Sequence, residues 1–218
     1  MSWSIKKTIV VLPVIVLALF YLKAKYHSIS QISRVKDFGA LTLTFFLLFL
    51  IIFIDVARRK EMESLKAFIL CTFYVYVFAV LILTGYFDLF RKISEHGWLH
   101  NLVQRVDRSE NINLIPFNTI KIYRFSQKQI WGNLLMLMPL GFYIPMLRKT
   151  RVNYLRVFLT AVAVSTSIEL LQLLTNFRSS DVDDIIMNTT GAVLGFFIFN
   201  ILSSPYFAKE RKSAILSL

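Results

Sequence analysis

Six long apolar runs constrain the fold of this chain more than any other feature of its sequence. A helix needs about 20 mostly apolar residues to cross the hydrocarbon core of a bilayer. The segments that meet this requirement are roughly residues 5–22, 38–56, 65–87, 130–147, 154–175 and 184–202. Hydrophobic residues make up 56% of the 218, above the roughly 45–50% of soluble domains. Because a span in lipid must satisfy its own backbone hydrogen bonds, the sequence predicts an all-α, polytopic integral membrane helical bundle.

The charged residues lie between these runs and predict how the chain is oriented. The formal net charge is +12, from 25 basic and 13 acidic residues. No basic domain stands apart from the spans, so we expect membrane lipids rather than nucleic acid as partners. Basic residues are densest in the short segments 1–7, 57–64 and 148–153 and in the C-terminal tail. Short basic loops stay in the cytoplasm, which predicts that both termini are cytoplasmic and that the N-terminal run is an uncleaved first span.

The spacing of the six runs divides the chain into four parts. The predicted parts are an N-terminal three-helix membrane region (1–90), a long extracytoplasmic loop (91–129), a C-terminal three-helix core (130–202) and a basic cytoplasmic tail (203–218).

The long loop contains a short stretch with helical periodicity, LHNLVQRV. Its apolar residues Leu99, Leu102, Val103 and Val106 recur at i, i+3, i+4 and i+7, which predicts an amphipathic helix. Such a helix either lies on the membrane surface as an interfacial helix or packs over the protein as a lid. The sequence leaves both interpretations open.

Polar residues gather around the junction of the fifth and sixth runs, IELLQLLTNFRSSDVDDIIMNTTGAVLG. The fourth run starts, the fifth ends and the sixth starts on one side of the membrane, whichever orientation the protein takes. Their polar residues therefore share one leaflet, which the charge pattern predicts to be the outer one. The candidate ligand-binding residues are Asn133, Glu169, Gln172, Arg178, Asp181, Asp183, Asp184 and Asn188.

Helical spacing aligns several of these residues. Ser165, Glu169 and Gln172 fall at i, i+4 and i+7, which is one face of the fifth helix. One stripe of the sixth helix holds Asp181, Asp184, Asn188, Gly191 and Gly195. The two glycines form a GxxxG pair that allows a neighbouring backbone to approach closely. Asp181 is in position to cap the start of the sixth helix.

Two interpretations of these polar residues remain open at this point. A charged side chain at mid-membrane costs about 2.5–3.5 kcal/mol on insertion scales, so Glu169 must face protein or water. Arg178 is the nearest cation in sequence and is expected to fold back over Glu169. The residues form either an interhelical clamp that locks the fifth helix to the sixth, or a pocket that binds a ligand.

Catalysis is the third possibility. Glu169 and Asp184 are the candidate general bases. The sequence contains no Walker loop, no GxSxG and no HExxH. We therefore leave the enzyme question open, with the balance against catalysis, and we expect neither a metal nor a cofactor.

The C-terminal half resembles the VanZ-like family of bacterial membrane proteins. The resemblance rests on NLIPF (Asn113 to Phe117), on NLLMLMPLGFYIP, in which Pro139, Gly141 and Pro145 break the fourth span, and on E-x-x-Q followed by R-x-x-D-x-D-D-x-x-x-N-x-x-G. It implies a role in resistance to glycopeptide antibiotics of the teicoplanin type or in protection of the cell envelope. It also implies a location in the bacterial cell membrane and a lipid-linked cell-wall precursor or a glycopeptide antibiotic as a further partner.

Overall fold

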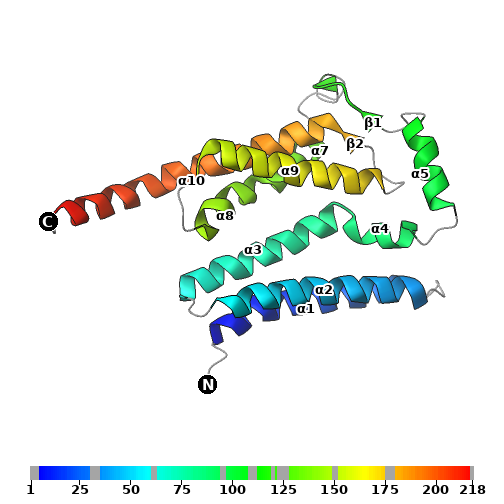
Figure 1. Cartoon of the computed structure of the whole chain (residues 1–218), viewed down its shortest axis with the longest axis horizontal. Helices are drawn as coiled ribbons and strands as arrows, with labels where there is room; N and C mark the ends of the chain where they lie inside the picture. The colour runs from blue at the N-terminus through cyan, green and yellow to red at the C-terminus, as the bar shows by residue number, and fades with distance from the viewer. Residues whose placement is uncertain are drawn as a thin grey trace. The chain divides into compact units, whose positions relative to one another are not determined.

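The computed structural model of the chain is almost entirely helical (Figure 1). It describes residues 5–29, 35–59, 63–93, 97–107, 112–118, 121, 128–148, 152–174 and 180–216. The six predicted spans are all present as helices long and apolar enough to cross a membrane. Their bounds are α1 Ile5–Ile29, α2 Val35–Arg58, α3 Ser64–Leu83, the pair α7 Lys128–Met136 and α8 Met138–Leu147, α9 Tyr154–Leu173, and α10 Val182–Leu216.

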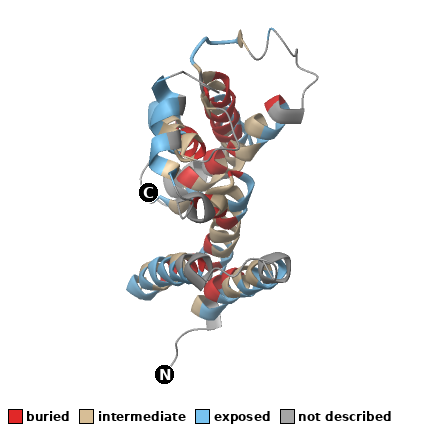
Figure 2. Cartoon of the chain, turned by 90° about the vertical axis from the view of Figure 1, so that its right-hand side faces the viewer, coloured by how far each residue is buried: buried red, intermediate tan, exposed pale blue. Residues whose placement is uncertain are grey.

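Large apolar side chains cover the outside of the spans, and Figure 2 shows exposed and buried stretches alternating along the helices. Phe20, Phe68 and Leu202 are 72%, 62% and 68% exposed. Water would penalise an apolar surface of this extent, whereas hydrocarbon solvates it. The protein is therefore a multi-pass membrane protein.

The chain divides into two compact units, and the first comprises residues 1–111 with 171–178. Its core lies among α1, α2, α3 and the short helix α4 (Tyr86–Ile93). Phe45 of α2 stacks on Phe87 of α4 with 5.0 Å between ring centroids, and Phe78 of α3 lies 5.6 Å from Phe45. Aromatic contacts at these separations add to the free energy of simple burial and hold α4 against the three spans.

The third span ends earlier than the predicted residue 87. Helix α3 stops at Leu83, and Gly85 follows in a left-handed conformation with φ 72°. The Gly85 N–H donates to Ile82 O at 3.1 Å, which closes the helix. Glycine adopts this conformation without steric cost. The apolar run continues to residue 87 because Phe87 is also a core residue, but Phe87 belongs to α4 and not to the span.

The predicted amphipathic helix in the long loop is confirmed as α5, Trp98–Asp107. The indole N–H of Trp98 donates to the Leu174 carbonyl oxygen at 3.0 Å, which fixes the start of α5 to the end of α9. Leu99 and Val103 are 64% and 51% exposed. The choice between a surface helix and a lid stays open.

The second unit comprises residues 112–170 with 179–218 and contains α7, α8, most of α9, and α10. The fourth span is divided as predicted, but only one of the three residues predicted to break it, Pro139, lies at the break. The break falls at Leu137, and Pro139 lies in the first turn of α8, where its missing N–H costs nothing. Gly141 and Pro145 lie inside α8.

The sixth span also differs from its predicted limits of 184 and 202. Helix α10 begins two residues earlier, at Val182, and continues to Leu216 through the segment predicted as a basic tail. Near the far end of the span, the Tyr154 ring of α9 packs edge-on against Phe196 of α10 with 4.8 Å between centroids. This contact joins α9 and α10 at the end opposite the polar residues.

Candidate functional site

Three glycines bring α10 into backbone contact with α7 and α8. A Cβ atom added at Gly191 or Gly195 would lie within 3.0 Å of the carbonyl of Leu134 or Met138, and one at Gly141 would meet the backbone of Ala192. Real Cβ atoms essentially never approach so closely. The close approach predicted for the Gly191/Gly195 pair is confirmed, and Gly141 serves the same packing from the opposite helix.

A hydrogen bond between buried side chains joins α10 to α9. The Asn188 amide nitrogen donates to the Ser165 hydroxyl oxygen at 2.9 Å, and both residues are at most 1% exposed. The predicted polar face of α9 is also buried, because Glu169 and Gln172 are 3% and 6% exposed. We call Ser165, Glu169, Asp181, Asp183, Asp184 and Asn188 the α9–α10 polar cluster.

Asp181 caps α10 and ties it to the loop that precedes α7. Its carboxylate accepts the backbone N–H of Asp183 at 2.9 Å, which confirms the predicted N-cap. The same carboxylate oxygen accepts the Asn113 side-chain amide at 3.1 Å. Asn113 belongs to β1 (Ile112–Asn113), which pairs in parallel with β2 (Ser180–Asp181). Two segments far apart in the sequence are thereby joined at the start of α10.

Glu169 binds the link between α9 and α10. Its Oε2 accepts the backbone N–H of Asp181 at 3.0 Å, and the Ser180 hydroxyl also hydrogen-bonds to it. The buried carboxylate thus has backbone and hydroxyl donors as partners, which offset part of its desolvation cost. Arg178 lies outside the described residues, so its pairing with Glu169 stays a prediction.

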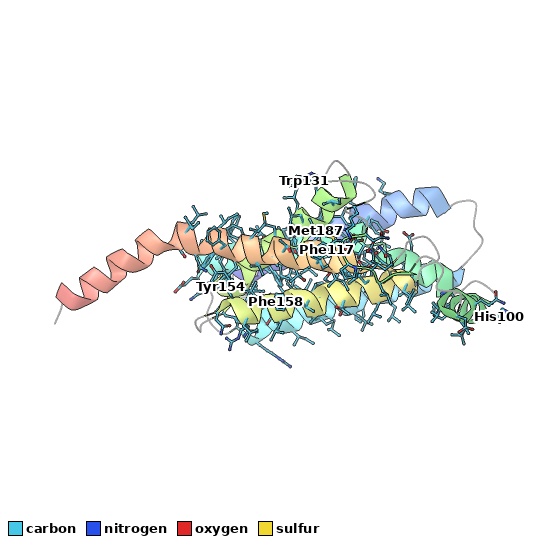
Figure 3. The ribbon with its side chains drawn as sticks, turned by 90° about the horizontal axis from the view of Figure 1, so that it is seen from above. His100, Phe117, Trp131, Tyr154, Phe158 and Met187 are labelled. Carbon is cyan, nitrogen blue, oxygen red and sulfur yellow. The ribbon has the colours of Figure 1, made fainter. Side chains whose placement is uncertain are left out.

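Asp183 holds the NLIPF loop (Asn113 to Phe117) from the first turn of α10. Its carboxylate accepts the Phe117 backbone N–H, and a carboxylate at this position also suits the positive end of the helix dipole. Phe117 has φ 62°, the one positive value among the described non-glycine residues. Figure 3 labels Phe117 in this loop and Met187 on α10.

The tip of this loop is apolar and exposed. Leu114, Ile115 and Phe117 are 74%, 65% and 51% exposed. The carboxylates therefore fix the backbone of a loop whose side chains point away from the protein interior. The arrangement places an apolar surface next to a polar anchor.

Three buried polar atoms near the contact between α7 and α10 have no hydrogen-bond partner in the described part of the chain. They are Asn133 Nδ2 of α7, and Asn188 Oδ1 and Thr189 Oγ1 of α10. Asn133 adjoins Leu134 in the sequence, and Asn188 and Thr189 precede Gly191 by three and two residues. An unsatisfied buried donor or acceptor costs about 1–3 kcal/mol, so a polar partner would stabilise each of these atoms.

The predicted residues are only partly brought together. Hydrogen bonds connect Glu169, Asp181 and Asp183 with the link and the NLIPF loop. Asp184 is buried in the first turn of α10, and Gln172 lies on the same face of α9 as Glu169. Within the described ranges, no group of three or more His, Cys, Asp or Glu is placed to hold a metal ion.

Sequence reasoning missed three participants in this region. The Phe117 backbone N–H carries no sequence signal, because its role depends on the loop conformation. Ser180 and Thr189 belong to the polar stretch but resemble ordinary linker and helix residues. Burial of Thr189 to 6% exposure appears only in three dimensions.

The fold and the buried polar residues define a class, the polytopic membrane proteins with polar groups at one end of their last three spans. The chain belongs to the VanZ/LLP1 family, whose sequence model matches residues 73–203, more than half of the chain. This match confirms the resemblance predicted from the C-terminal motifs. Comparison with curated proteins and with solved structures gives no match.

Proposed function

We propose that the α9–α10 polar cluster and the adjoining NLIPF loop bind the headgroup of a lipid or a lipid-linked cell-wall precursor at the outer leaflet. Through this binding, the protein contributes to resistance against glycopeptide antibiotics of the teicoplanin type or to protection of the cell envelope. Membership of the VanZ/LLP1 family supports the resistance role.

The observation that carries the proposal is the set of unsatisfied buried atoms. Asn188 Oδ1 and Thr189 Oγ1 accept hydrogen bonds, and Asn133 Nδ2 donates them. A ligand with hydroxyl, amide or phosphate groups complements such a mixed set. Asn188 is the central residue, because its Nδ2 is already fixed by Ser165 and its Oδ1 is thereby oriented.

The exposed loop supports an amphipathic ligand over a purely polar one. Leu114, Ile115 and Phe117 provide apolar contacts beside the polar cluster. In this arrangement the polar atoms of α7 and α10 contact the headgroup, and the loop side chains contact apolar parts of the ligand near the start of α10. Asp183 positions the loop through the Phe117 backbone N–H, and Asp181 does so through the Asn113 side chain.

A pair of substitutions separates ligand binding from helix clamping. Ser165→Ala removes the hydrogen bond to Asn188 Nδ2 but keeps Asn188 Oδ1, whereas Asn188→Ala removes both. The expected result is a larger loss of glycopeptide resistance for Asn188→Ala at equal membrane expression. Thr190→Ala is the control, because Thr190 is exposed on the same helix and bonds only to its own helix backbone.

The measurement is the minimal inhibitory concentration of teicoplanin in cells where deletion of the protein changes susceptibility. Equal loss in Ser165→Ala and Asn188→Ala, matched by equal loss of thermal stability, would show that the cluster is only a clamp. Lipid analysis of the same cells tests for catalysis. If a lipid headgroup species is present only when Glu169 is intact, the protein acts as an enzyme and the binding proposal is wrong.

A further inference from the structure

The first unit carries a second concentration of charge, at the ends of α1 and α2 away from the aromatic core. Asp55 of α2 accepts two hydrogen bonds from Arg59 Nη2, at 3.2 and 3.3 Å, and a third from the Tyr74 hydroxyl of α3. The Lys7 ammonium of α1 donates to the Ala57 carbonyl oxygen at 3.3 Å. Asp55 therefore joins α2 to α3, and Lys7 joins the start of α1 to the end of α2.

Arg59 keeps unused donor capacity in this arrangement. Both contacts to Asp55 come from Nη2, and the Nε atom is buried without a hydrogen-bond partner in the described part of the chain. Guanidinium groups bind phosphate through two adjacent N–H donors. Asp55 orients the guanidinium through Nη2, and the exposed part of the side chain is available to an anion, whereas the buried Nε is not.

The local charge favours an anion as well. Lys7, Arg58 and Arg59 carry three positive charges against the single negative charge of Asp55. Arg58 is exposed and the Arg59 side chain is 40% exposed, so a headgroup at the membrane surface can reach them.

An apolar groove lies between the same two helices. It has a volume of about 250 Å³ and is lined by α1 residues such as Val14 and Ala18 and by α2 residues such as Leu48 and Phe49. Along α1 it extends from Val14 to Leu22, which is about 12 Å of helix. A hydrocarbon chain is the shape and polarity that such a groove accepts.

Helical periodicity connects the cations to the groove. Lys7, Val14 and Ala18 recur at i, i+7 and i+11 on α1, so they share one face. On α2, the groove residue Leu48 lies seven residues before Asp55, which binds Arg59 just beyond the end of the helix. Lys7 precedes the groove by seven residues, or about 10 Å along the helix. In a phospholipid, the phosphate likewise lies at the membrane surface and the acyl chain deeper in the membrane.

From these two features together, we propose that α1 and α2 bind an anionic phospholipid. Its phosphate lies against Lys7 and Arg59, and one acyl chain occupies the α1–α2 groove. The site is built from residues outside the α9–α10 polar cluster and is independent of the proposed function. Its ligand is a lipid of the leaflet that faces the start of α1 and the end of α2.

The test is native mass spectrometry of the purified full chain with equal amounts of dioleoylphosphatidylglycerol and dioleoylphosphatidylcholine. Because each cation near a membrane surface favours an anionic lipid about fivefold, the parent should retain several times more phosphatidylglycerol. Lys7→Gln combined with Arg59→Gln should bring the two lipids close to equal retention. Equal retention by the parent would overturn the proposal without any variant.

Two control variants make the test specific. Lys66→Gln combined with Arg156→Gln removes the same charge elsewhere, because Lys66 pairs with Glu63 and Arg156 is exposed on α9. An equal loss of preference in this control would show diffuse attraction and no site. Leu19→Trp should fill the groove and lower retention of both lipids.

Leu12→Trp is the control for the groove, since Leu12 is exposed on the same helix but does not line it. Unchanged lipid retention in Leu19→Trp would remove the acyl-chain part of the proposal. If the Arg59 variant does not fold, Lys7→Gln alone and the groove variants still decide the outcome.

Discussion

At the residue scale, the surroundings of each glycine decide whether a larger residue fits at that position. Gly191, Gly195 and Gly141 contact backbone atoms of a neighbouring helix, whereas Gly132 of α7 has nothing within 4 Å of an added Cβ. The GxxxG spacing in the sequence identified two of the contact glycines. It could not identify Gly141, whose partner lies on another helix.

Gly191→Ala should therefore destabilise the protein, because α7 and α10 must separate to admit the methyl group, at a cost of about 1–3 kcal/mol. Gly132→Ala should stabilise it by about 0.5–1 kcal/mol through higher helix propensity. Thermal unfolding in detergent measures both. Similar melting temperatures for the two variants would contradict the backbone contact at Gly191.

Asp183 provides a second prediction for a single side chain. Asp183→Ala leaves the Phe117 N–H without its acceptor, whereas Asp183→Asn keeps an oxygen in the same place. The bond is partly buried, so losing the acceptor should cost about 1 kcal/mol, at the lower end of the range for an unsatisfied donor. Hydrogen exchange of residues 112–118 should accelerate strongly in the alanine variant and much less in the asparagine variant. Equal acceleration would mean that charge, and not the hydrogen bond, holds the loop.

At the scale of elements, the NLIPF loop shows what sequence reasoning can and cannot reach. Pro116 and the flanking asparagines predict an irregular segment. The parallel pairing of β1 with β2 joins residues 68 positions apart, as in the contact between Asn113 and Asp181. Local periodicity contains no information on such a contact, which depends on how α7 to α9 fold between the two strands.

Phe117→Gly tests whether the loop's side chain or its backbone matters. Glycine adopts the positive φ of this position without the cost of about 1–2 kcal/mol that a side chain carries. The variant should match or exceed the parent in thermal stability, yet lose resistance if the exposed ring contacts the ligand. Full resistance in this variant would remove Phe117 from the proposed site.

At the scale of the whole molecule, the number of spans was predictable because hydrophobicity over about 20 residues is a strong signal. The limits were less predictable where other forces ended or extended a helix, as at Gly85 after α3 and at Leu137 between α7 and α8. The polar cluster was predicted from span order. Of its hydrogen bonds, the N-cap at Asp181 was predicted, but the bonds to Phe117 and Asn113 were not, because they depend on how the distant loop folds.

Orientation leads to a further prediction. Residues 63 and 115 are separated by one span, α3, so they should lie on opposite sides of the membrane. In a Cys71→Ala background, which removes the single natural cysteine, Ile115→Cys should react with a membrane-impermeant maleimide in intact cells. Glu63→Cys should react only after permeabilisation. The reverse pattern would invert the proposed orientation, and labelling of both in intact cells would contradict a span at α3.

The pairing of β1 with β2 has a consequence for the order of synthesis. A ribosome adds about 5–20 residues per second, so Asn113 emerges roughly 3–14 s before Asp181, which lies 68 positions later. During that interval the NLIPF loop lacks the carboxylates that fix its backbone. A chain that stops before α10 leaves this apolar segment unsecured and open to proteases. Synthesis of the start of the last span is therefore the step that protects the loop, and proteases can distinguish a complete chain from an aborted one by this loop.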